Sequence, residues 1–415
     1  MAETAQQSER FNPISRENLL DPYPFYAALR EQDPVHWSKT VHAWIITRHQ
    51  DVMGCLRDSR LSANRVKFFE YQVQSAGGGL EIIQDLIHTF VRQMGMMDGP
   101  EHLRLRRQAS PGFSPLVIDS WGPTIRKTMA LLLDHVHSWG RMDLVQEISY
   151  QLPPLIIAEM LGIPTEDRER FQTWVKPIAQ LASPVAGVDI VMLARQANTA
   201  MREICDFLLE IIDRRIKEPG GDDLLSRLIH RQEEDRMSRE ELAANAMLIL
   251  SAGHVTTTDQ ISNAVHLLLT HPEQLARLQE DRSLLKSAVE EILRYSPAIP
   301  FVARSAVTTF ELRGKTIKEG DVVFIGIGSA NRDETVFPEP DRFDIQRDHF
   351  MQKHLSFAFG PHHCLGAGLA RRELETSMEM LLDRLPGLRL DEEQPARLKC
   401  DNLILRGFES LPVRW

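Results

Sequence analysis

The chain has 415 residues, is 43% hydrophobic and carries a formal net charge of −10. A chain of this length can bury a large core, and its acidic balance argues against a nucleic-acid partner. The four cysteines, Cys55, Cys205, Cys364 and Cys400, contain no CxxC pair, so they indicate neither a disulfide framework nor a zinc site. We therefore expect a protein of a reducing compartment that binds no nucleic acid.

The N-terminus, residues 1–10, is polar and has no apolar run long enough for a signal peptide or a membrane anchor. We expect this stretch to be disordered and the protein to be cytoplasmic, with no membrane contact. No Pro- or Ser-rich linker, repeat or low-complexity tract divides the chain. The sequence therefore predicts a single domain over residues 1–415.

Apolar residues recur at helical spacing through most of the first 300 positions. Runs rich in β-branched and aromatic residues interrupt this pattern at 43–48 and 310–328. The sequence predicts a mainly α fold with a minor β portion. The glycines at 77–79 and the run 181–189 predict loops, which are either ordinary surface loops or lids over a pocket.

One long helix can be bounded from its end signals. Ser238 followed by Glu241 forms a capping box, and Pro272 stops the pattern just beyond Thr270. At ~1.5 Å of rise per residue, such a helix spans on the order of 48 Å, enough to cross a domain. Its middle contains Gly253 and three successive threonines, which are poor helix formers. That local weakness needs an explanation, since a purely structural helix would favour Ala or Leu there.

The strongest pattern is FAFGPHHCLGAGLARRELE, in which Phe357, Gly360, Cys364 and Gly366 have the spacing FxxGxxxCxG before an amphipathic helix. A cysteine at the start of a helix faces the positive end of the helix dipole and free N–H groups, which stabilise a thiolate. The glycines allow unusual dihedrals and a close approach to a flat macrocycle. A thiolate ligand pushes electron density onto haem iron and favours O–O cleavage. The pattern therefore predicts a haem-thiolate site with Cys364 as the ligand of the metal.

Two simpler interpretations of this segment remain open. A single cysteine is most often a small buried hydrophobic residue. His362, His363 and Cys364 are also possible zinc ligands, but three adjacent residues do not easily converge on a tetrahedral site, and no fourth ligand is near in sequence. Neither interpretation explains the whole spacing, so we favour haem.

The cysteine segment resembles the haem-binding loop of the cytochrome P-450 family, and further family patterns follow in order across nearly the whole chain. The opening FNPISRENLLDPYPFYAALRE and the ending LRGFESLPVRW are similar to the bacterial, soluble branch. The resemblance implies a cytochrome P-450-like fold with haem b buried between the long helix and the cysteine loop. It also implies a monooxygenase that uses O2 to hydroxylate or epoxidise a hydrophobic small molecule in secondary metabolism, with a ferredoxin and ferredoxin reductase as electron donors.

The resemblance also assigns roles to residues outside the loop. The haem-binding set is completed by residues of an oxygen-binding groove and by propionate partners, namely Ala252, Gly253, His102, Arg106, Arg304 and His362. Glu291 and Arg294 match the ExxR pair of the family, and Arg342 completes a buried triad. On their own, a Glu and an Arg three residues apart most often form a solvated contact worth about a few tenths of a kcal/mol.

Thr256 is assigned to proton delivery, because its hydroxyl can hold a water for acid chemistry on oxygen. The simpler interpretation is a hydroxyl bonded to its own helix. Family members usually carry an acidic residue just before this threonine, but this chain has Val255 there. The proton route must therefore use water, His254 or Asp259, which lies one turn after Val255. Val255 also leaves open an atypical outcome such as desaturation, coupling or peroxide use. A second departure is Ala358, where glycine is common and alanine requires a negative φ.

The substrate pocket is expected to be lined by apolar residues near 68–86, on the long helix and after the ExxR helix, namely Phe68, Leu248, Ala252, Ile299, Phe301 and Val302. Each of these is equally a candidate core residue. A local basic surface of Arg107, Lys353, Arg371 and Arg372 is a candidate dock for an acidic ferredoxin, with ordinary solvated charges as the alternative. The non-enzymatic alternative is a helical module that binds haem or another ligand and has lost oxygen chemistry.

Overall fold

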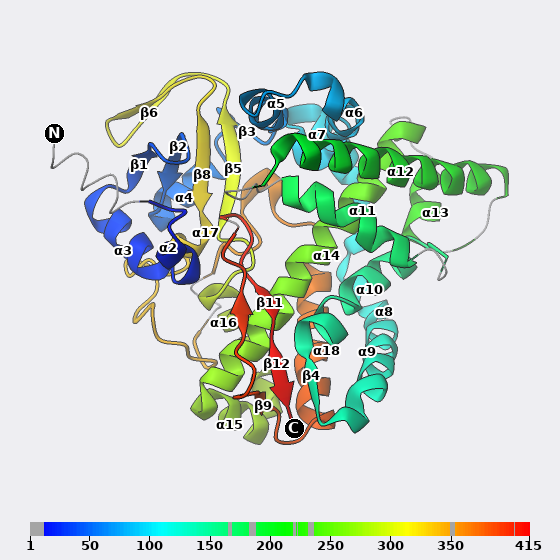
Figure 1. Cartoon of the computed structure of the whole chain (residues 1–415), viewed down its shortest axis with the longest axis vertical. Helices are drawn as coiled ribbons and strands as arrows, with labels where there is room; N and C mark the ends of the chain where they lie inside the picture. The colour runs from blue at the N-terminus through cyan, green and yellow to red at the C-terminus, as the bar shows by residue number, and fades with distance from the viewer. Residues whose placement is uncertain are drawn as a thin grey trace.

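The computed structural model describes residues 12–164, 168–181, 188–218, 221, 223–230, 236–348, 353–401 and 403–415. The disorder expected at 1–10 lies outside these residues, as does most of the loop expected at 181–189. In Figure 1 helices make up the larger part of the molecule, and strands form a smaller part beside them. The expected mainly α fold with a minor β portion is confirmed.

Helices carry most of the described chain. Those of the first half are α2 (Arg16–Leu20), α3 (Tyr23–Gln32), α4 (His49–Cys55), α5 (Val66–Ser75), α6 (Gln84–Phe90), α7 (Gly99–Ala109), α8 (Pro115–Ser120), α9 (Gly122–Val136), α10 (Leu152–Met160), α11 (Arg168–Leu181) and α12 (Ile190–Lys217). Those of the second half are α13 (Leu224–Ile229), α14 (Arg239–Thr270), α15 (Pro272–Glu280), α16 (Leu285–Tyr295), α17 (Ile327–Ala330) and α18 (Ala367–Arg384).

Helix α14 is the long helix that the end signals predicted. Ser238 Oγ accepts the Glu241 N–H at 3.1 Å, and the Glu241 carboxylate accepts the Ser238 N–H at 2.8 Å. The helix ends at Thr270, and Pro272 begins α15. Because α14 packs against α10, α12 and α18, most of its residues are buried and it runs through the middle of the molecule (Figure 1). The predicted bounds are confirmed.

The main sheet joins strands from both ends of the chain in the order β1–β2–β8–β5–β3. The strands are β1 (Val35–Ser38), β2 (Ala43–Ile46), β3 (Leu61–Ser62), β5 (Phe301–Ala306) and β8 (Val322–Gly326). β2 and β8 are parallel, and the other neighbours are antiparallel. The strand predicted at 43–48 is β2, and the run 310–328 forms β6 (Phe310–Leu312), β7 (Lys315–Ile317) and β8.

Two smaller sheets lie near the C-terminus. One has the order β4–β12–β9 and the other pairs β10 with β11. Their bounds are β4 (Arg141–Asp143), β9 (Arg389–Leu390), β10 (Arg397–Leu398), β11 (Phe408–Ser410) and β12 (Pro412–Arg414). β11 contacts α14, so the C-terminal segment lies beside the central helix.

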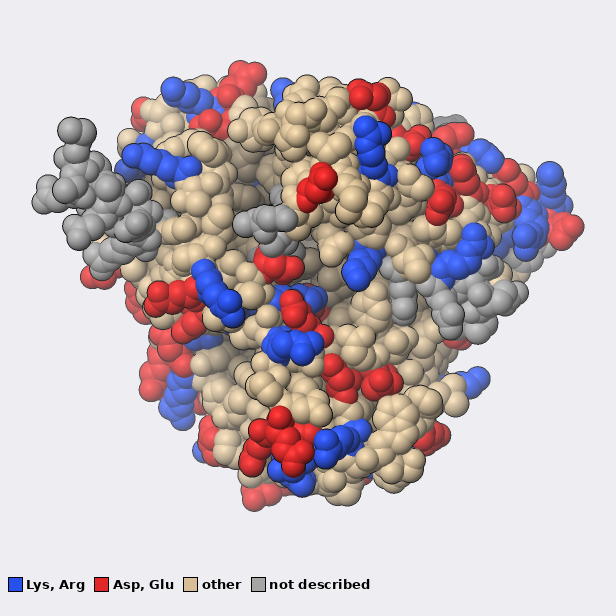
Figure 2. All heavy atoms as spheres, in the orientation of Figure 1, with Lys and Arg blue, Asp and Glu red and all other residues tan. Residues whose placement is uncertain are grey.

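The buried apolar residues form one large cluster among the helices and two smaller clusters around the main sheet. Within the described ranges, no helix combines the length and the apolar character needed to cross a bilayer. On the face shown in Figure 2, basic and acidic side chains are interspersed over the surface. That face therefore carries no large field of one sign, in contrast to the basic stripe of a typical nucleic-acid-binding protein.

Candidate active site

The cysteine loop, residues 357–366, contains a short 3-10 turn, η8 (Gly360–His362), and ends at the start of α18. The Cys364 N–H donates to the Phe357 carbonyl at 2.8 Å, which closes the loop. Gly360 has φ +79°, and a Cβ there would lie 2.7 Å from Arg57 Cγ, so both its conformation and its surroundings require glycine. Gly366 has φ −84° and needs no such freedom. The expectation of unusual dihedrals is therefore confirmed at Gly360 and wrong at Gly366.

Ala358 contradicts the expectation of a negative φ. Its φ is +57°, in the left-handed region that alanine rarely adopts, and its N–H donates to the Leu355 carbonyl at 2.8 Å. The left-handed conformation costs a residue with a Cβ about 1–2 kcal/mol. The loop therefore carries local backbone strain six residues before the cysteine, because its closing hydrogen bonds fix the backbone there.

The Cys364 thiol lies among groups that oppose each other in their effect on its pKa. Burial raises the pKa of Cys364 above its ordinary value, although its side chain keeps an accessible surface. The Gly366 N–H and the guanidiniums of Arg106 and Arg371 lower the pKa and partly offset burial. These groups would stabilise a thiolate once a cationic metal takes the proton's place. The predicted position of the cysteine at the start of a helix is confirmed.

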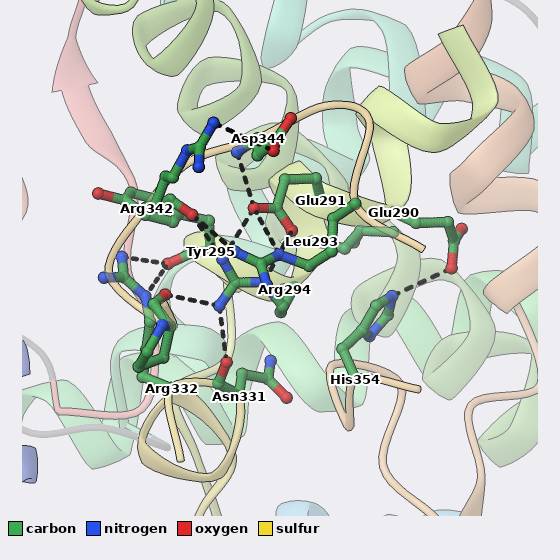
Figure 3. A network of polar contacts seen from close by, with 12 residues as sticks. Glu290, Glu291, Leu293, Arg294, Tyr295, Asn331, Arg332, Arg342, Asp344 and His354 are labelled. Atoms are coloured by element: carbon green, nitrogen blue, oxygen red, sulfur yellow. Dashed lines mark hydrogen bonds and ion pairs between the residues drawn. The ribbon is translucent and has the colours of Figure 1, made fainter. Parts of the chain in front are cut away.

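The ExxR pair forms a buried ion pair on α16. Arg294 Nε and Nη2 donate to the two Glu291 carboxylate oxygens at 2.7 and 2.8 Å, and neither side chain is exposed. Figure 3 shows the carboxylate and the guanidinium side by side. Arg294 also donates to the carbonyls of Asn331 and Pro340 at 2.9 and 2.8 Å. The pair therefore ties α16 to the segment 331–344, which precedes the cysteine loop.

The buried triad is completed by Arg347, not by Arg342. The Arg342 side chain is 53% exposed and pairs with Glu339 at 3.2 Å, so only its carbonyl accepts from Arg294. Arg347 is 10% exposed, and its Nε lies 3.2 Å from the Glu291 carboxylate. A turn in which the Arg347 N–H donates to the Asp344 carbonyl directs the later arginine inward. The motif resemblance pointed to the earlier arginine, and the nearby Arg347 was the signal that we missed.

The residues expected at the haem propionates come together. The His102 and His362 rings stack with centroids 4.1 Å apart, and His102 is buried. Arg106 lies one turn after His102 on α7 and donates to a carbonyl of the cysteine loop. Burial lowers the pKa of His102 to about 4, and the charges of His362, Arg106 and Arg304 add to this effect. The His102 ring is therefore neutral at pH 7 and surrounded by positive groups.

This cluster holds more guanidinium charge than the described residues neutralise. Asp98 accepts a hydrogen bond from His362 Nε2 at 3.1 Å. Arg304 donates to the Ala303 carbonyl at 2.9 Å and, like Arg65 beside it, forms no ion pair within the described part of the chain. Arg65 was missed from the sequence because a lone arginine carries no pattern. A half-buried excess of guanidinium suits an anionic group, and the two haem propionates are such groups.

The middle of α14 contains one residue suited to contact a flat ligand and one that serves packing. Ala252 is exposed, although the helix around it is largely buried. A Cβ on Gly253 would lie 2.1 Å from Ile157 Cδ1 on α10. Gly253 therefore lets two helices approach closely. Its missing side chain faces α10 rather than the haem contact that we expected.

Thr256 and His254 point to different sides of α14. The Thr256 hydroxyl donates to the Ala252 carbonyl at 2.8 Å, so it is bonded to its own helix. The His254 ring is buried 4.8 Å from the Tyr150 ring, and its Nε2 has no partner among the described residues. Burial lowers the pKa of His254 to about 4. Residues two positions apart on a helix face nearly opposite directions, so His254, one of the three proton routes considered, lies on the side of α14 away from Thr256.

Asp259 carries a buried carboxyl group. It lies seven residues after Ala252 and therefore on the same side of α14. Its Oδ1 accepts from Lys399 Nζ at 2.6 Å, whereas its Oδ2 has no partner among the described residues. Burial raises the pKa of Asp259 to about 6 against the opposing effect of Lys399. Lys399 was missed because the two residues are distant in sequence. Asp259 therefore remains a candidate acid for proton transfer near neutral pH.

The residues expected to line the substrate pocket divide by burial. The half-buried members are Phe68, Leu248, Ile299 and Val302. Phe301 is fully buried, and its ring packs edge-to-face against Tyr26 at 5.5 Å. Side chains alternate along a strand, so Phe301 faces α3 whereas Val302 faces the other side of β5. The expectation for Phe301 is therefore wrong, because this residue belongs to the core.

A family model described as cytochrome P450 matches residues 87–405. The chain belongs to the cytochrome P450 family. Among its relatives, the 6-deoxyerythronolide B hydroxylase of Saccharopolyspora erythraea is 36% identical, over 95% of this chain and 96% of that protein. The mycinamicin IV hydroxylase/epoxidase of Micromonospora griseorubida is 36% identical over 94% of each.

The fold of this P450 matches solved structures of the family. P450BioI, solved in complex with an acyl carrier protein ligated to hexadec-9Z-enoic acid, aligns with a TM-score of 0.86 and 33% identity. The alignment covers 97% of this chain and all of that one. This P450 therefore has the cytochrome P450 fold, binds haem b through a cysteine thiolate and is an oxygen-incorporating oxidoreductase.

These findings decide between the alternatives left open by the sequence. The non-enzymatic interpretation is overturned by family membership and by relatives named as hydroxylases and monooxygenases. The atypical outcome suggested by Val255 finds no support, because the relatives' names give hydroxylation and epoxidation. Among the described residues, no three His, Cys, Asp or Glu side chains gather to hold a metal ion, so the zinc interpretation finds no support either.

Proposed function

We propose that this P450 hydroxylates or epoxidises a hydrophobic small molecule of secondary metabolism, with Cys364 as the axial ligand of the haem iron. The observation that carries the assignment is the closed loop around Cys364, whose sulfur faces the Gly366 N–H at the start of α18. Packing of α18 against α14 supports a haem between the cysteine loop and the middle of the central helix. When bound, the haem supplies the oxygen-activating chemistry that a thiolate ligand promotes.

The residues around this position have distinct tasks in the proposal. Arg106 and Arg304 would supply charge-assisted hydrogen bonds to the propionates, and the neutral His102 would donate another from its ring N–H. Ala252, in the middle of α14, would offer a small surface on the side of the haem opposite the cysteine loop. The half-buried Phe68, Leu248, Ile299 and Val302 supply the apolar lining that holds a substrate and excludes water.

Reduction of the purified protein under carbon monoxide tests the axial ligand. We expect the Soret band of a haem-thiolate complex from the wild type and its loss in Cys364→Ser. The matched control is Cys400→Ser, since Cys400 is a half-buried free cysteine in the C-terminal segment, and this variant should keep the band. A normal thiolate band from Cys364→Ser would refute the assignment.

We infer that Thr256 and Asp259 together supply protons for oxygen chemistry, replacing the acid absent at Val255. The Thr256 hydroxyl lies on the same face as Ala252, and the Asp259 carboxyl, whose pKa is about 6, lies one turn further along. Lys399 connects this carboxyl to the C-terminal segment and is itself partly exposed. A buried acid with a pKa near neutrality is suited to general acid catalysis.

The fraction of consumed electrons that appears in product measures this role. Thr256→Ala and Asp259→Asn should each lower that fraction at least about tenfold, because a positioned proton donor contributes at least that much. Thr270→Ala is the control, since the Thr270 hydroxyl also donates to the carbonyl four residues earlier, at 2.8 Å, but at the end of α14. Equal coupling in Thr256→Ala and Thr270→Ala would leave Thr256 with a structural role only.

Electrons are proposed to come from a ferredoxin that is reduced by a ferredoxin reductase. Of the expected docking residues, Arg107 and Lys353 are exposed. Arg371 is engaged, since its Nε lies 2.5 Å from a Glu290 carboxylate oxygen, so it has less charge to offer an acidic partner. Reduction rates that fall steeply with added salt would support an electrostatic dock.

We further infer that residues 1–415 work as one domain in the cytoplasm. Helix α14 contacts elements from both halves of the chain, and all four cysteines are free, which suits a reducing compartment. The relative P450BioI was solved with an acyl carrier protein. Substrate screening by spin-state shift should therefore include free and carrier-bound acyl compounds as well as macrolides.

A further inference from the structure

Arg65 stands near the proposed propionate partners without an ionic partner of its own. It is the half-buried residue that precedes α5. Neighbouring arginines are engaged elsewhere: Arg57 lies over the Phe359 ring at 5.0 Å, and Arg60 pairs with Asp58 at 2.7 Å. For Arg65, the described residues provide neither an ion pair nor a side-chain hydrogen bond. A half-buried guanidinium without a partner is costly to desolvate, so an anion bound beside it would stabilise it.

The pairing of β3 with β5 brings Arg65 close to Arg304. Ser62 pairs antiparallel with Ser305, so the chain after Ser62 runs back along the residues before Ser305. Arg65 is three residues beyond Ser62, and Arg304 immediately precedes Ser305. Burial lowers the pKa of Arg65 to about 10, and the positive charge of Arg304 adds to this effect. The two guanidiniums therefore share one environment.

Asp98 fixes this part of the chain to the rest of the cluster. Its carboxylate accepts from the Ser62 hydroxyl and from the Ala63 N–H at 3.0 Å, and also from His362 Nε2 at 3.1 Å. Burial raises the pKa of Asp98, but the hydrogen bonds from His362 and Ser62 outweigh it and lower the pKa to about 2. Since Asp98 is also the N-cap residue of α7, one ionised acid holds together the segment before Arg65, the start of α7 and the cysteine loop.

Counted as guanidiniums against carboxylates, the cluster matches two propionates only when Arg65 is included. Arg65, Arg106 and Arg304 carry three positive charges and Asp98 carries one negative charge, which leaves an excess of two. Two carboxylates neutralise that excess. Without Arg65 the excess would be one, and one of two ionised propionates would lack a compensating charge in a half-buried site.

We propose that Arg65 binds a haem propionate together with Arg304, as a third guanidinium of the propionate site. The inference rests on the proposed placement of the propionates beside His102, Arg106 and Arg304. A guanidinium presents two parallel donors to a carboxylate, so Arg65 can satisfy a propionate that Arg304 contacts from β5. Arg65 thereby links haem retention to the segment between β3 and α5.

Haem transfer from the substrate-free holoenzyme to apomyoglobin tests this role, together with the reduction potential of the haem. We expect Arg65→Gln to lose haem about tenfold faster, because a charge-assisted hydrogen bond is removed. Its potential should fall, because a positive charge near the haem favours the reduced state. Lys67→Gln removes the same charge from an exposed position on α5 and should leave both quantities unchanged.

Two further variants make the outcome decisive. Arg65→Lys keeps the charge but not the planar pair of donors, so its potential should stay near wild type and its haem loss should be intermediate. A potential that falls as far in Arg65→Lys as in Arg65→Gln overturns the electrostatic role. Arg304→Gln separates the two proposals: faster haem loss in Arg304→Gln with none in Arg65→Gln refutes only the inference for Arg65, whereas no change in either variant refutes the propionate site as a whole.

Discussion

At the scale of single residues, the ionised carboxylate of Glu291 is stabilised by two guanidiniums that come from different parts of the chain. Its carboxylate is fully buried between Arg294 of its own helix and Arg347 of a distant turn, and it also accepts the Asp344 N–H at 3.0 Å. A buried carboxylate is stable only while its partners stay in place, because removing one leaves uncompensated charge.

Arg347→Ala should therefore lower the free energy of unfolding by about 3 kcal/mol and reduce the yield of haem-loaded protein. Arg342→Ala is the matched control, since it removes an arginine five positions earlier whose side chain is exposed, and it should cost less than about 0.5 kcal/mol. Urea unfolding of the two holoenzymes gives both values. Equal costs would contradict the role given to Arg347, and a larger cost for Arg342→Ala would show that the original assignment to Arg342 was correct.

Residue-level prediction succeeded where a residue type and a spacing together define the chemistry. Cys364, Gly360 and the Glu291–Arg294 pair lie as expected because the motif contains their geometry. It failed where the geometry depends on how the backbone turns. Ala358 is left-handed because loop-closing hydrogen bonds outweigh its own preference, and a spacing does not report such a balance.

At the scale of elements, the contact between α14 and α10 depends on the missing side chain of Gly253. Gly253→Ala would gain about 1 kcal/mol of helix propensity but place a Cβ 2.1 Å from the buried Ile157 Cδ1, which costs about 1–3 kcal/mol. We expect net destabilisation in thermal unfolding. The Ile157→Val change removes the colliding atom, so the double variant should be more stable than the sum of the single changes predicts. Additive effects would contradict a direct clash.

Element-level prediction was accurate for α14 and for β2 because their signals are local. The capping box and the proline fix both ends of α14, and branched apolar residues mark β2. The sequence does not reveal which elements meet. The contacts of Gly253 with Ile157 and of Asp259 with Lys399 join segments about 100 or more positions apart, so neither has a local pattern. The predictions for Gly253, His254 and Phe301 failed for this reason.

At the scale of the whole molecule, Glu373 makes stability depend on pH. It is buried on α18, its Oε2 has no partner among the described residues, and burial raises its pKa from 4.5 to about 8. The folded state therefore holds the proton more tightly than the unfolded state. The contribution of this group to stability is fully present below about pH 4.5 and is lost as the pH rises towards 8.

Glu373→Gln removes this dependence by mimicking the protonated acid. Between about pH 5 and pH 8, the unfolding free energy of the wild type should fall relative to that of the variant by up to about 1.4 kcal/mol per pH unit. Glu379→Gln, six residues further along α18 and paired with Arg126, serves as the control and should show no such trend. Parallel pH profiles for wild type and Glu373→Gln in urea titrations would mean that Glu373 is ionised in the folded protein.

The parallel pairing of β2 with β8 determines how late in synthesis the main sheet can be completed. Trp44 pairs with Val323, so the first strands leave the ribosome long before the strand that completes their sheet. At a synthesis rate of about 5–20 residues per second, they wait on the order of 15 to 60 seconds with an open, apolar edge. Local helices can form meanwhile, but the sheet cannot close. Newly made chains therefore pass through a period in which chaperone binding to the N-terminal strands competes with aggregation.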